Sequence, residues 1–245
     1  MKRIESVNNQ YIKDLYKLHE KKYRDLEKKF LVEGVHLVSE AYKTKNLEAV
    51  LFCDEKYKLE GVENILVNDI IIQKLAFTKT PQKLIGVCKQ INIKNASPSK
   101  FLLLDDIQDP GNLGTLTRSS LGFNIDRIYL SKGSVDIYND KFIRASSGAI
   151  FHIDIEIVDL KEKILELKEQ GIDIFGTSVE NGVLLENIKS NKYAIILGNE
   201  GSGVKKEILD LTTKNIFIKT NPLLESLNVS VAGSIILYYL NSIKS

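Results

Sequence analysis

Short apolar runs alternate with segments of helical periodicity through residues 100–245, and this alternation restricts the possible folds strongly. Residues 101–104 are continuously apolar and are followed by two aspartates, as expected for a strand buried on both faces of a parallel sheet. Similar runs predict strands over 127–130, 153–157, 172–176, 193–197 and 215–218. Helices are predicted over 113–121, 160–169, 205–211 and 229–243. The predicted fold class is therefore α/β, a mostly parallel sheet with helices on both faces.

A second, smaller domain is expected at the front of the chain. Residues 92–100 are polar and contain Pro98, which suits a linker. The residues before this linker predict a small α/β unit, with strands over 30–32, 47–53 and 84–87 and helices over 8–19, 35–42 and 70–76. We expect two domains, over residues 1–94 and 100–245.

Composition excludes several classes of protein. Neither a membrane-spanning run of roughly 20 apolar residues nor a signal peptide is visible, so a cytoplasmic protein without a membrane partner is expected. The two cysteines, Cys53 and Cys88, are too few for a disulfide framework or a zinc site, and no metal is expected. The net charge of +2 does not by itself indicate a nucleic-acid-binding protein.

The charge is unevenly distributed, however. Residues 1–29 hold nine Lys or Arg against five Asp or Glu, with tyrosines between them. Basic side chains neutralise phosphates, and tyrosines stack on unpaired bases. Lys21, Lys22 and Arg24 are therefore candidates for RNA binding. The alternative, a solvated Lys/Glu helix face, is the more common explanation of such a pattern.

Three stretches place polar residues where ligand sites form in α/β proteins. After the strand at 101–104 comes Asp109-Pro110-Gly111-Asn112, a turn and helix start, with Arg118 six residues on. Spacing alone favours the simpler explanation, a plain helix cap and a surface arginine. We expect the two side chains to lie on roughly related faces and to point into one cleft.

The second stretch is Gly198-Asn199-Glu200-Gly201-Ser202-Gly203, which interrupts an apolar strand. Its glycines permit close backbone approach to a ligand, although a tight strand–helix turn would also need them. Their spacing fits neither a dinucleotide fingerprint nor a phosphate-binding loop.

The third stretch, Ser226-Leu227-Asn228-Val229-Ser230, opens the predicted last helix. Ser226 is a candidate cap for that helix, and Asn228 offers both a donor and an acceptor. A capped terminal helix with a small-residue packing face would explain most of this stretch.

In this order, the three stretches resemble the signature motifs of the SpoU/TrmH methyltransferases of the SPOUT superfamily. Arg144-Ala145-Ser146-Ser147-Gly148 is similar to a further segment of that family. The resemblance covers about residues 100–245, and residues 21–34 resemble the ribosomal-protein-like RNA-binding domain often fused to it. The departure from the pattern is Lys219, where the family often has a proline after the isoleucine matched by Ile218.

The resemblance implies a deep trefoil knot, a homodimer formed through the knotted domain, and S-adenosyl-methionine as cofactor. It implies transfer of a methyl group to a ribose 2′-hydroxyl of structured RNA, with ribosomal RNA favoured over transfer RNA. The implied cofactor-binding residues are Thr177, Leu197, Gly198, Asn199, Gly201, Ile218 and Leu227, and Arg144 joins the RNA-binding set. The implied catalytic residues are Arg118, Asn112, Glu200, Ser226 and Asn228.

Within that set, the family proposal makes Arg118 the general base. A guanidinium is a donor only and keeps its proton at any ordinary pH. We therefore expect Arg118 to orient the ribose hydroxyl or its phosphate and to stabilise developing negative charge. Asn112, Ser226 and Asn228 would hold Arg118 and the target nucleotide, and Glu200 would anchor the loop between them.

Two other functions stay open at this stage. The first is a catalytically lapsed RNA-binding or ribosome-assembly protein, which Lys219 favours and the intact polar set disfavours. The second is a methyltransferase acting on transfer RNA, or on a base. Base methyltransferases of this superfamily generally use an acid to take the proton, so Asn112 with Arg118 favours ribose.

Overall fold

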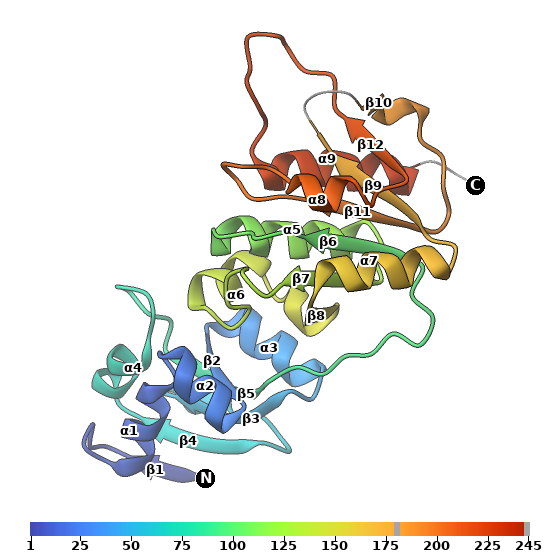
Figure 1. Cartoon of the computed structure of the whole chain (residues 1–245). Helices are drawn as coiled ribbons and strands as arrows, with labels where there is room; N and C mark the ends of the chain where they lie inside the picture. Colours follow the sequence, from blue (N-terminus) through green and yellow to red (C-terminus); the bar gives the residue numbers. More distant parts are fainter. Residues whose placement is uncertain (179–181, 243–245) are drawn as a thin grey trace. The chain divides into compact units, whose positions relative to one another are not determined.

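The computed structural model describes residues 1–178 and 182–242, which form two compact units (Figure 1). The first unit comprises Met1–Asn92 and Asp136–His152, and the second comprises Ile93–Val135 and the chain from Ile153 onward. Residues 136–152, which the sequence assigns to the second domain, thus pack with the first unit. The predicted α/β class is confirmed in both units.

The first unit is built on a five-stranded mixed sheet in the order β1-β4-β3-β5-β2. Strands β1, β4 and β3 are parallel, whereas β5 runs antiparallel to both β3 and β2. The strands are β1 (Lys2–Ile4), β2 (Lys29–Glu33), β3 (Leu47–Phe52), β4 (Glu63–Val67) and β5 (Leu84–Lys89). The helices are α1 (Gln10–Lys17), α2 (Lys21–Glu27), α3 (Val35–Lys43), α4 (Asp69–Leu75) and α6 (Asp140–Ser146), with single 3₁₀ turns at Glu55–Tyr57 and Ala149–Phe151.

Segment 136–152 belongs to the first unit because its aromatic side chains enter that unit's core. Phe30 of β2 is buried, and its ring lies 4.7 Å from the ring of Tyr138 and 6.1 Å from that of Phe151. The Tyr138 hydroxyl accepts a hydrogen bond of 2.8 Å from the backbone N–H of Ile91. Local sequence patterns could not predict this packing, because Ile91 and Tyr138 are 47 residues apart.

The second unit contains a seven-stranded parallel sheet in the order β10-β12-β9-β11-β6-β7-β8. Its strands are β6 (Lys100–Leu104), β7 (Arg127–Ser131), β8 (Asp154–Val158), β9 (Asp173–Thr177), β10 (Val183–Leu184), β11 (Tyr193–Leu197) and β12 (Lys214–Phe217). Its helices are α5 (Pro110–Gly122), α7 (Leu160–Glu169), α8 (Lys206–Leu209) and α9 (Val229–Ser242), with a 3₁₀ turn at Leu185–Asn187.

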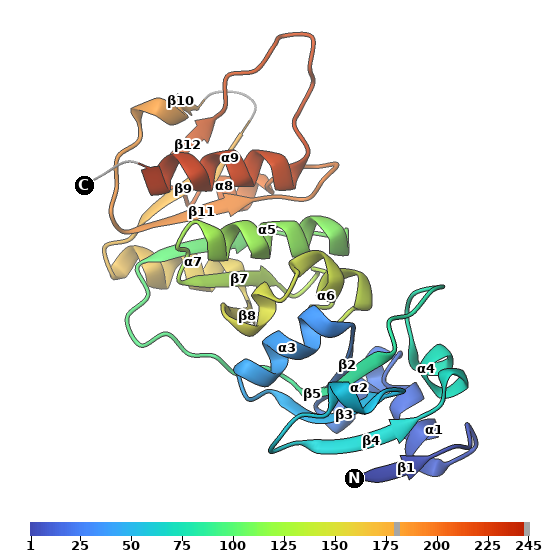
Figure 2. The same cartoon turned by 180° about the vertical axis from the view of Figure 1, so that it is seen from behind.

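Helices cover both faces of this sheet, as predicted. Figure 1 shows α7 and α8 in front of the strands, and Figure 2 shows α5 and α9 on the opposite face. Successive residues of β11 face opposite sides of the sheet: Ile196 belongs to the cluster that includes Ile164 of α7, while Leu197 lies against Gly233 of α9. Because both faces are buried, each central strand must be apolar throughout, which explains the continuous run at 101–104.

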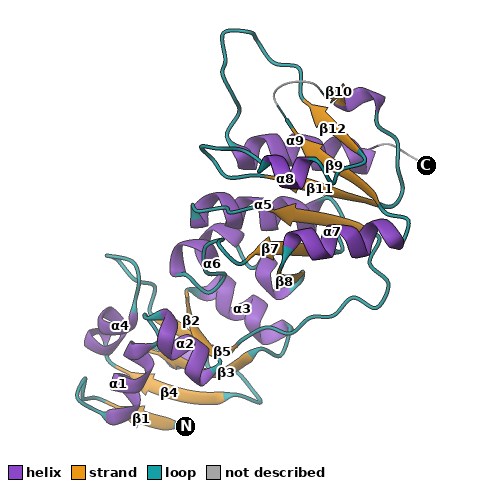
Figure 3. Cartoon of the chain, in the orientation of Figure 1, coloured by secondary structure: helices purple, strands orange, loops and turns teal. Residues whose placement is uncertain are grey.

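The central strands all end at one edge of the parallel sheet. Strands β6, β9, β11 and β12 are hydrogen-bonded in register and point the same way. Their carboxyl ends therefore bring together loops from distant parts of the chain, the usual location of a ligand site in such sheets. The loop after β12, residues 218–228, contains neither helix nor strand (Figure 3).

Candidate active site

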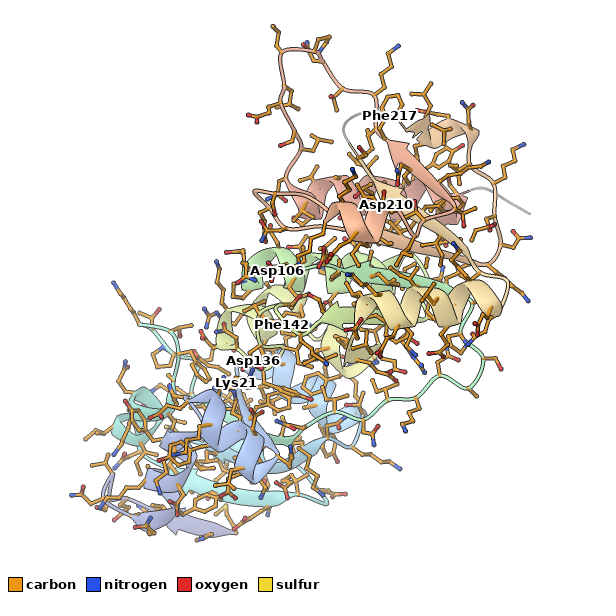
Figure 4. The ribbon with its side chains drawn as sticks, viewed as in Figure 1. Lys21, Asp106, Asp136, Phe142, Asp210 and Phe217 are labelled. Carbon is orange, nitrogen blue, oxygen red and sulfur yellow. The ribbon has the colours of Figure 1, made fainter. Side chains whose placement is uncertain are left out.

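The turn after β6 is shaped by its own aspartates and leads directly into α5. Asp106 lies just past the end of β6, with φ of 61° (Figure 4). Asp109 caps α5, because its Oδ1 accepts a hydrogen bond of 2.9 Å from the backbone N–H of Asn112. Pro110 occupies the first helical turn, where its missing N–H costs nothing. Asn112 is thus fixed in the first turn, at the carboxyl edge of the sheet.

The glycine-rich stretch after β11 closes on itself as a small loop. Asn199 and Gly203 exchange backbone hydrogen bonds of 3.0 and 2.9 Å, and Gly203 has φ of 70°. A Cβ at residue 198 would lie 2.0 Å from the backbone carbonyl carbon of Gly203, so only glycine fits there. The loop also ties to the turn after β6, since Asn199 Nδ2 donates to the carbonyl of Asp106 at 2.9 Å.

Glu200 projects from this loop onto the N-terminal end of α5. Its carboxylate accepts hydrogen bonds from the backbone N–H groups of Gln108 (3.2 Å) and Asp109 (3.1 Å), and from Asn112 Nδ2 (3.1 Å). Partial burial opposes ionisation of Glu200, but these hydrogen bonds outweigh it and lower the pKa of its carboxyl group. Glu200 is therefore a charged anchor that joins the first two stretches.

Asn228 joins the third stretch to the same cluster. Its Nδ2 donates a hydrogen bond of 3.1 Å to Asn112 Oδ1, and its own Oδ1 accepts bonds from the backbone N–H of Ser230 (2.8 Å) and of Val231 (3.3 Å). Asn228 is thus the residue that caps α9. The expectation that Ser226 caps this helix is wrong, because Ser226 is exposed and its side chain bonds to none of the described residues.

Arg118 stands apart from this network. It is exposed on α5, and its side chain makes no hydrogen bond or ion pair within residues 1–178 and 182–242. A six-residue step in a helix is about 9 Å along the axis and roughly a third of a turn out of phase. The expectation that Asn112 and Arg118 lie on related faces therefore does not hold for α5. The free guanidinium remains available to a substrate.

The residues expected to bind the cofactor lie around the carboxyl ends of neighbouring strands. Thr177 ends β9 and donates from Oγ1 to the carbonyl of Ile196 at 2.8 Å, while the buried Leu197 ends β11. Ile218 follows β12 and is half-buried, as is Leu227 just before Asn228. Within the glycine-rich loop, the backbone N–H of Gly201 donates to Asn199 Oδ1 at 2.9 Å.

Of the four residues expected to bind RNA, Arg24 has a different role. Lys21 and Lys22 are exposed on α2, and Arg144 is half-exposed and paired with Asp140 at 2.5 Å. Arg24 is buried, and its guanidinium donates to the carbonyls of Leu18 and His19 at 2.8 Å each and to the Asp136 carboxylate at 2.6 Å. Lys21 of α2 and Asp136, the partner of Arg24, can be found by their labels in Figure 4. A guanidinium held in this way is not available to a phosphate, so the prediction for Arg24 is wrong.

Sequence reasoning missed the partners that hold the glycine-rich loop in place. The buried Asp105 carboxylate accepts from the backbone N–H and the Nζ of Lys205, both at 3.3 Å. The only signal was a pair of adjacent acids directly after a buried strand.

Among the described residues no helix is long and apolar enough to cross a membrane, and no group of His, Cys, Asp and Glu side chains could hold a metal ion.

Two protein-family models match parts of this chain. The model of the SpoU rRNA Methylase family matches residues 99–238, and that of the MRM3-like substrate binding domain matches residues 9–86. The chain is 37% identical to the 23S rRNA (guanosine(2553)-2′-O)-methyltransferase RlmP of Bacillus subtilis, over 98% of this chain and 99% of the relative.

Solved structures are similar over nearly the whole chain. A TrmH-family protein from Porphyromonas gingivalis has a TM-score of 0.86 at 27% identity, covering 96% of this chain and 98% of the other. The AdoMet-bound rRNA methyltransferase from Sinorhizobium meliloti has a TM-score of 0.89 at 24% identity, covering 98% and 97%, a likeness of fold alone. The chain therefore belongs to the SpoU rRNA methylase family, and it is a methyltransferase.

Proposed function

We propose that this protein transfers the methyl group of S-adenosyl-methionine to a ribose 2′-hydroxyl of 23S ribosomal RNA. The observation that carries the proposal is the hydrogen-bonded chain Glu200–Asn112–Asn228, because it joins three stretches that each resemble a family signature. The full-length relative is named for this reaction at guanosine 2553 of 23S rRNA, which supports that RNA and that nucleotide. Transfer RNA is the alternative substrate, and the cytoplasm is the expected location of either.

The carboxyl edge of the parallel sheet fits the cofactor. Open space surrounds Gly203 where a side chain would stand, so its backbone is accessible to a ligand, and the half-buried Ile218 and Leu227 offer apolar surface for an adenine ring. Thr177, Leu197, Asn199 and Gly201 complete the proposed lining. When bound, the cofactor supplies an electrophilic methyl group.

The chain's own residues would then position the ribose. The hydroxyl oxygen must lose its proton while it bonds to the methyl carbon, and the carbon–sulfur bond would break with its electron pair leaving on the sulfur, as a thioether. Alignment of these atoms supplies much of the rate. Arg118 is a donor whose side chain has no partner among the described residues, so it is free to bind the phosphate beside the reacting sugar. A phosphate oxygen held in this way accepts the proton, and Arg118 stabilises the negative charge that develops.

Asn112, Glu200 and Asn228 form the rigid frame of this site. Glu200 fixes the glycine-rich loop to α5, and Asn228 fixes the loop before α9 to Asn112. Ser226 is exposed beside this frame and is proposed to contact the nucleotide. A trefoil knot through these loops remains the prediction that the family resemblance makes.

RNA binding and dimerisation complete the proposal. Lys21, Lys22 and the half-exposed Arg144 would contact RNA phosphates from the first unit. On α9, Val231, Ile235 and Tyr238 are 47%, 39% and 60% exposed, and such apolar exposure on a terminal helix supports a homodimer formed there. Sedimentation equilibrium of the purified protein tests the dimer.

Methyl transfer in vitro tests the activity. Purified protein is incubated with 23S rRNA and S-adenosyl-methionine carrying a tritiated methyl group, and labelled RNA is counted. Wild type is expected to label the RNA, while Arg118→Ala labels none and still binds the cofactor by calorimetry. Wild-type turnover by Arg118→Ala would refute the role of this residue, and cofactor binding without labelling of any RNA would favour a lapsed enzyme.

A further inference from the structure

Asp105 connects both ends of the glycine-rich loop. It directly follows β6, and its backbone N–H donates to the carbonyl of Leu197, the residue before the loop, at 2.9 Å. Its carboxylate accepts from the backbone N–H and from the Nζ of Lys205, the residue after Val204, at 3.3 Å each. Asp105 is therefore hydrogen-bonded to both residues that flank the loop of residues 198–204.

The contact between Asp105 and Lys205 differs from an ordinary surface ion pair in how unequally its two side chains are exposed. The Asp105 side chain is 3% exposed, whereas that of Lys205 is 53% exposed. An ion pair with one arm in solvent adds little to global stability, because water and salt screen it. A buried carboxylate nonetheless needs hydrogen-bond donors, and here the donors come from the segment that closes the loop. The contact therefore acts mainly on the conformation of that loop.

We propose that Asp105 is a positioning residue, which through Lys205 holds residues 198–204 in the conformation that binds the cofactor. This inference rests on the proposed cofactor site at Gly198, Asn199 and Gly201. If Asp105 no longer holds the loop, fewer molecules have the competent conformation, and the apparent affinity falls by that fraction. Once the cofactor is bound it selects the competent loop, so the chemical step is preserved.

The test uses the full-length protein in four variants, with 23S rRNA as methyl acceptor. Asp105→Asn keeps the shape and removes the charge, and Lys205→Met removes the ammonium while keeping the stem. Lys205→Arg restores a cation at the same place. Lys206→Met is the matched control, because Lys206 is an exposed neighbour whose side chain has no partner in the described part of the chain. Steady-state kinetics are measured against S-adenosyl-methionine, with calorimetric Kd and thermal midpoint alongside.

Asp105→Asn is expected to raise KM and Kd for S-adenosyl-methionine about tenfold, as for loss of a charge-assisted hydrogen bond. Its kcat at saturating cofactor should stay within about twofold of wild type. Lys205→Met should raise KM by a smaller factor, and Lys205→Arg and Lys206→Met should match wild type. The inference is overturned if Asp105→Asn lowers the thermal midpoint with KM and Kd unchanged, or lowers kcat alone. Failure of wild type itself to bind the cofactor would overturn the proposed function instead, and this inference with it.

Discussion

Asn228 donates a 3.1 Å hydrogen bond from Nδ2 to the side-chain carbonyl of Asn112, although 116 residues separate them. Because Asn112 also donates to Glu200, a single amide connects the loop before α9 with the loop after β11. An amide has both a donor and an acceptor, so Asn112 can satisfy both partners at once. A carboxylate at 112 would face the Glu200 charge, and a hydrocarbon would lose both bonds.

Gly198→Ala is predicted to disrupt the glycine-rich loop. The new Cβ would lie 2.0 Å from the Gly203 carbonyl carbon, and backbone cannot move aside as a flexible side chain can. The expected cost is about 1–3 kcal/mol of unfolding free energy, with loss of cofactor binding, measured by urea unfolding and calorimetry. Gly122→Ala in α5 is the control, because its Cβ would meet no atom within 4 Å. Equal effects of the two substitutions would show that the close approach at Gly198 is unimportant.

The Glu200 anchor predicts a pH dependence of stability. Its pKa is lowered in the folded chain, so its contribution is present above the unfolded value near 4.5 and is lost as pH falls through the lower folded value. Glu200→Gln replaces one of the two acceptor oxygens by an NH2 group, which can donate but cannot accept a hydrogen bond. Urea unfolding should therefore show wild type more stable than Glu200→Gln near neutral pH. The two should converge in acid, and a pH-independent difference would contradict the charged anchor.

Asp136→Asn is predicted to destabilise the protein strongly. It leaves the Arg24 guanidinium buried without its counter-charge, since the two side chains are only 8% and 16% exposed. Breaking such a pair by removing one partner costs about 3–5 kcal/mol. Asp140→Asn is the matched control in the same segment, because the Asp140–Arg144 pair is exposed and should contribute less than about 1 kcal/mol. Chemical denaturation compares the two variants, and similar losses would mean that Arg24 is not the structural anchor.

Substitution of Lys21 and Lys22 together by alanine is predicted to weaken RNA binding without affecting stability. Both side chains are exposed, so each is free to neutralise a phosphate. Loss of two such contacts should reduce the slope of log affinity against log salt by about 1 to 2. Filter binding over a salt series measures the slope, with Lys58→Ala as an exposed control in the same unit. An unchanged slope would exclude these lysines from the RNA interface.

The sequence predicted those features that depend on local pattern. The run at 101–104 predicts a strand buried on two faces, and the structure confirms it as β6, an interior strand of the parallel sheet between β11 and β7. The sequence predicts Ser226 as the cap of α9, whereas the structure shows Asn228 in that role. Several polar residues stand near the start of this helix, and any of them could serve as its cap. Only tertiary contacts decide which of them does so.

Long-range packing explains the other differences between the sequence-based predictions and the structure. Arg24 looks like a surface cation in sequence, and only the carbonyls of the preceding turn and Asp136, 112 residues away, reveal it as buried. Segment 136–152 follows a strand of the second unit, yet Tyr138 and Phe151 fit around Phe30 of the first. No periodicity or propensity carries this information, because it depends on which cavity a side chain fills.

Mapping of ribose methylation in total RNA tests the central claim most directly. RNA is compared from cells with the gene, without it, and with the gene restored as wild type or as Arg118→Ala. We expect one ribose 2′-O-methyl group of 23S rRNA, at the guanosine equivalent to 2553, to disappear without the gene and to return only with wild type. An unchanged ribose-methylation map in the absence of the gene would contradict the account.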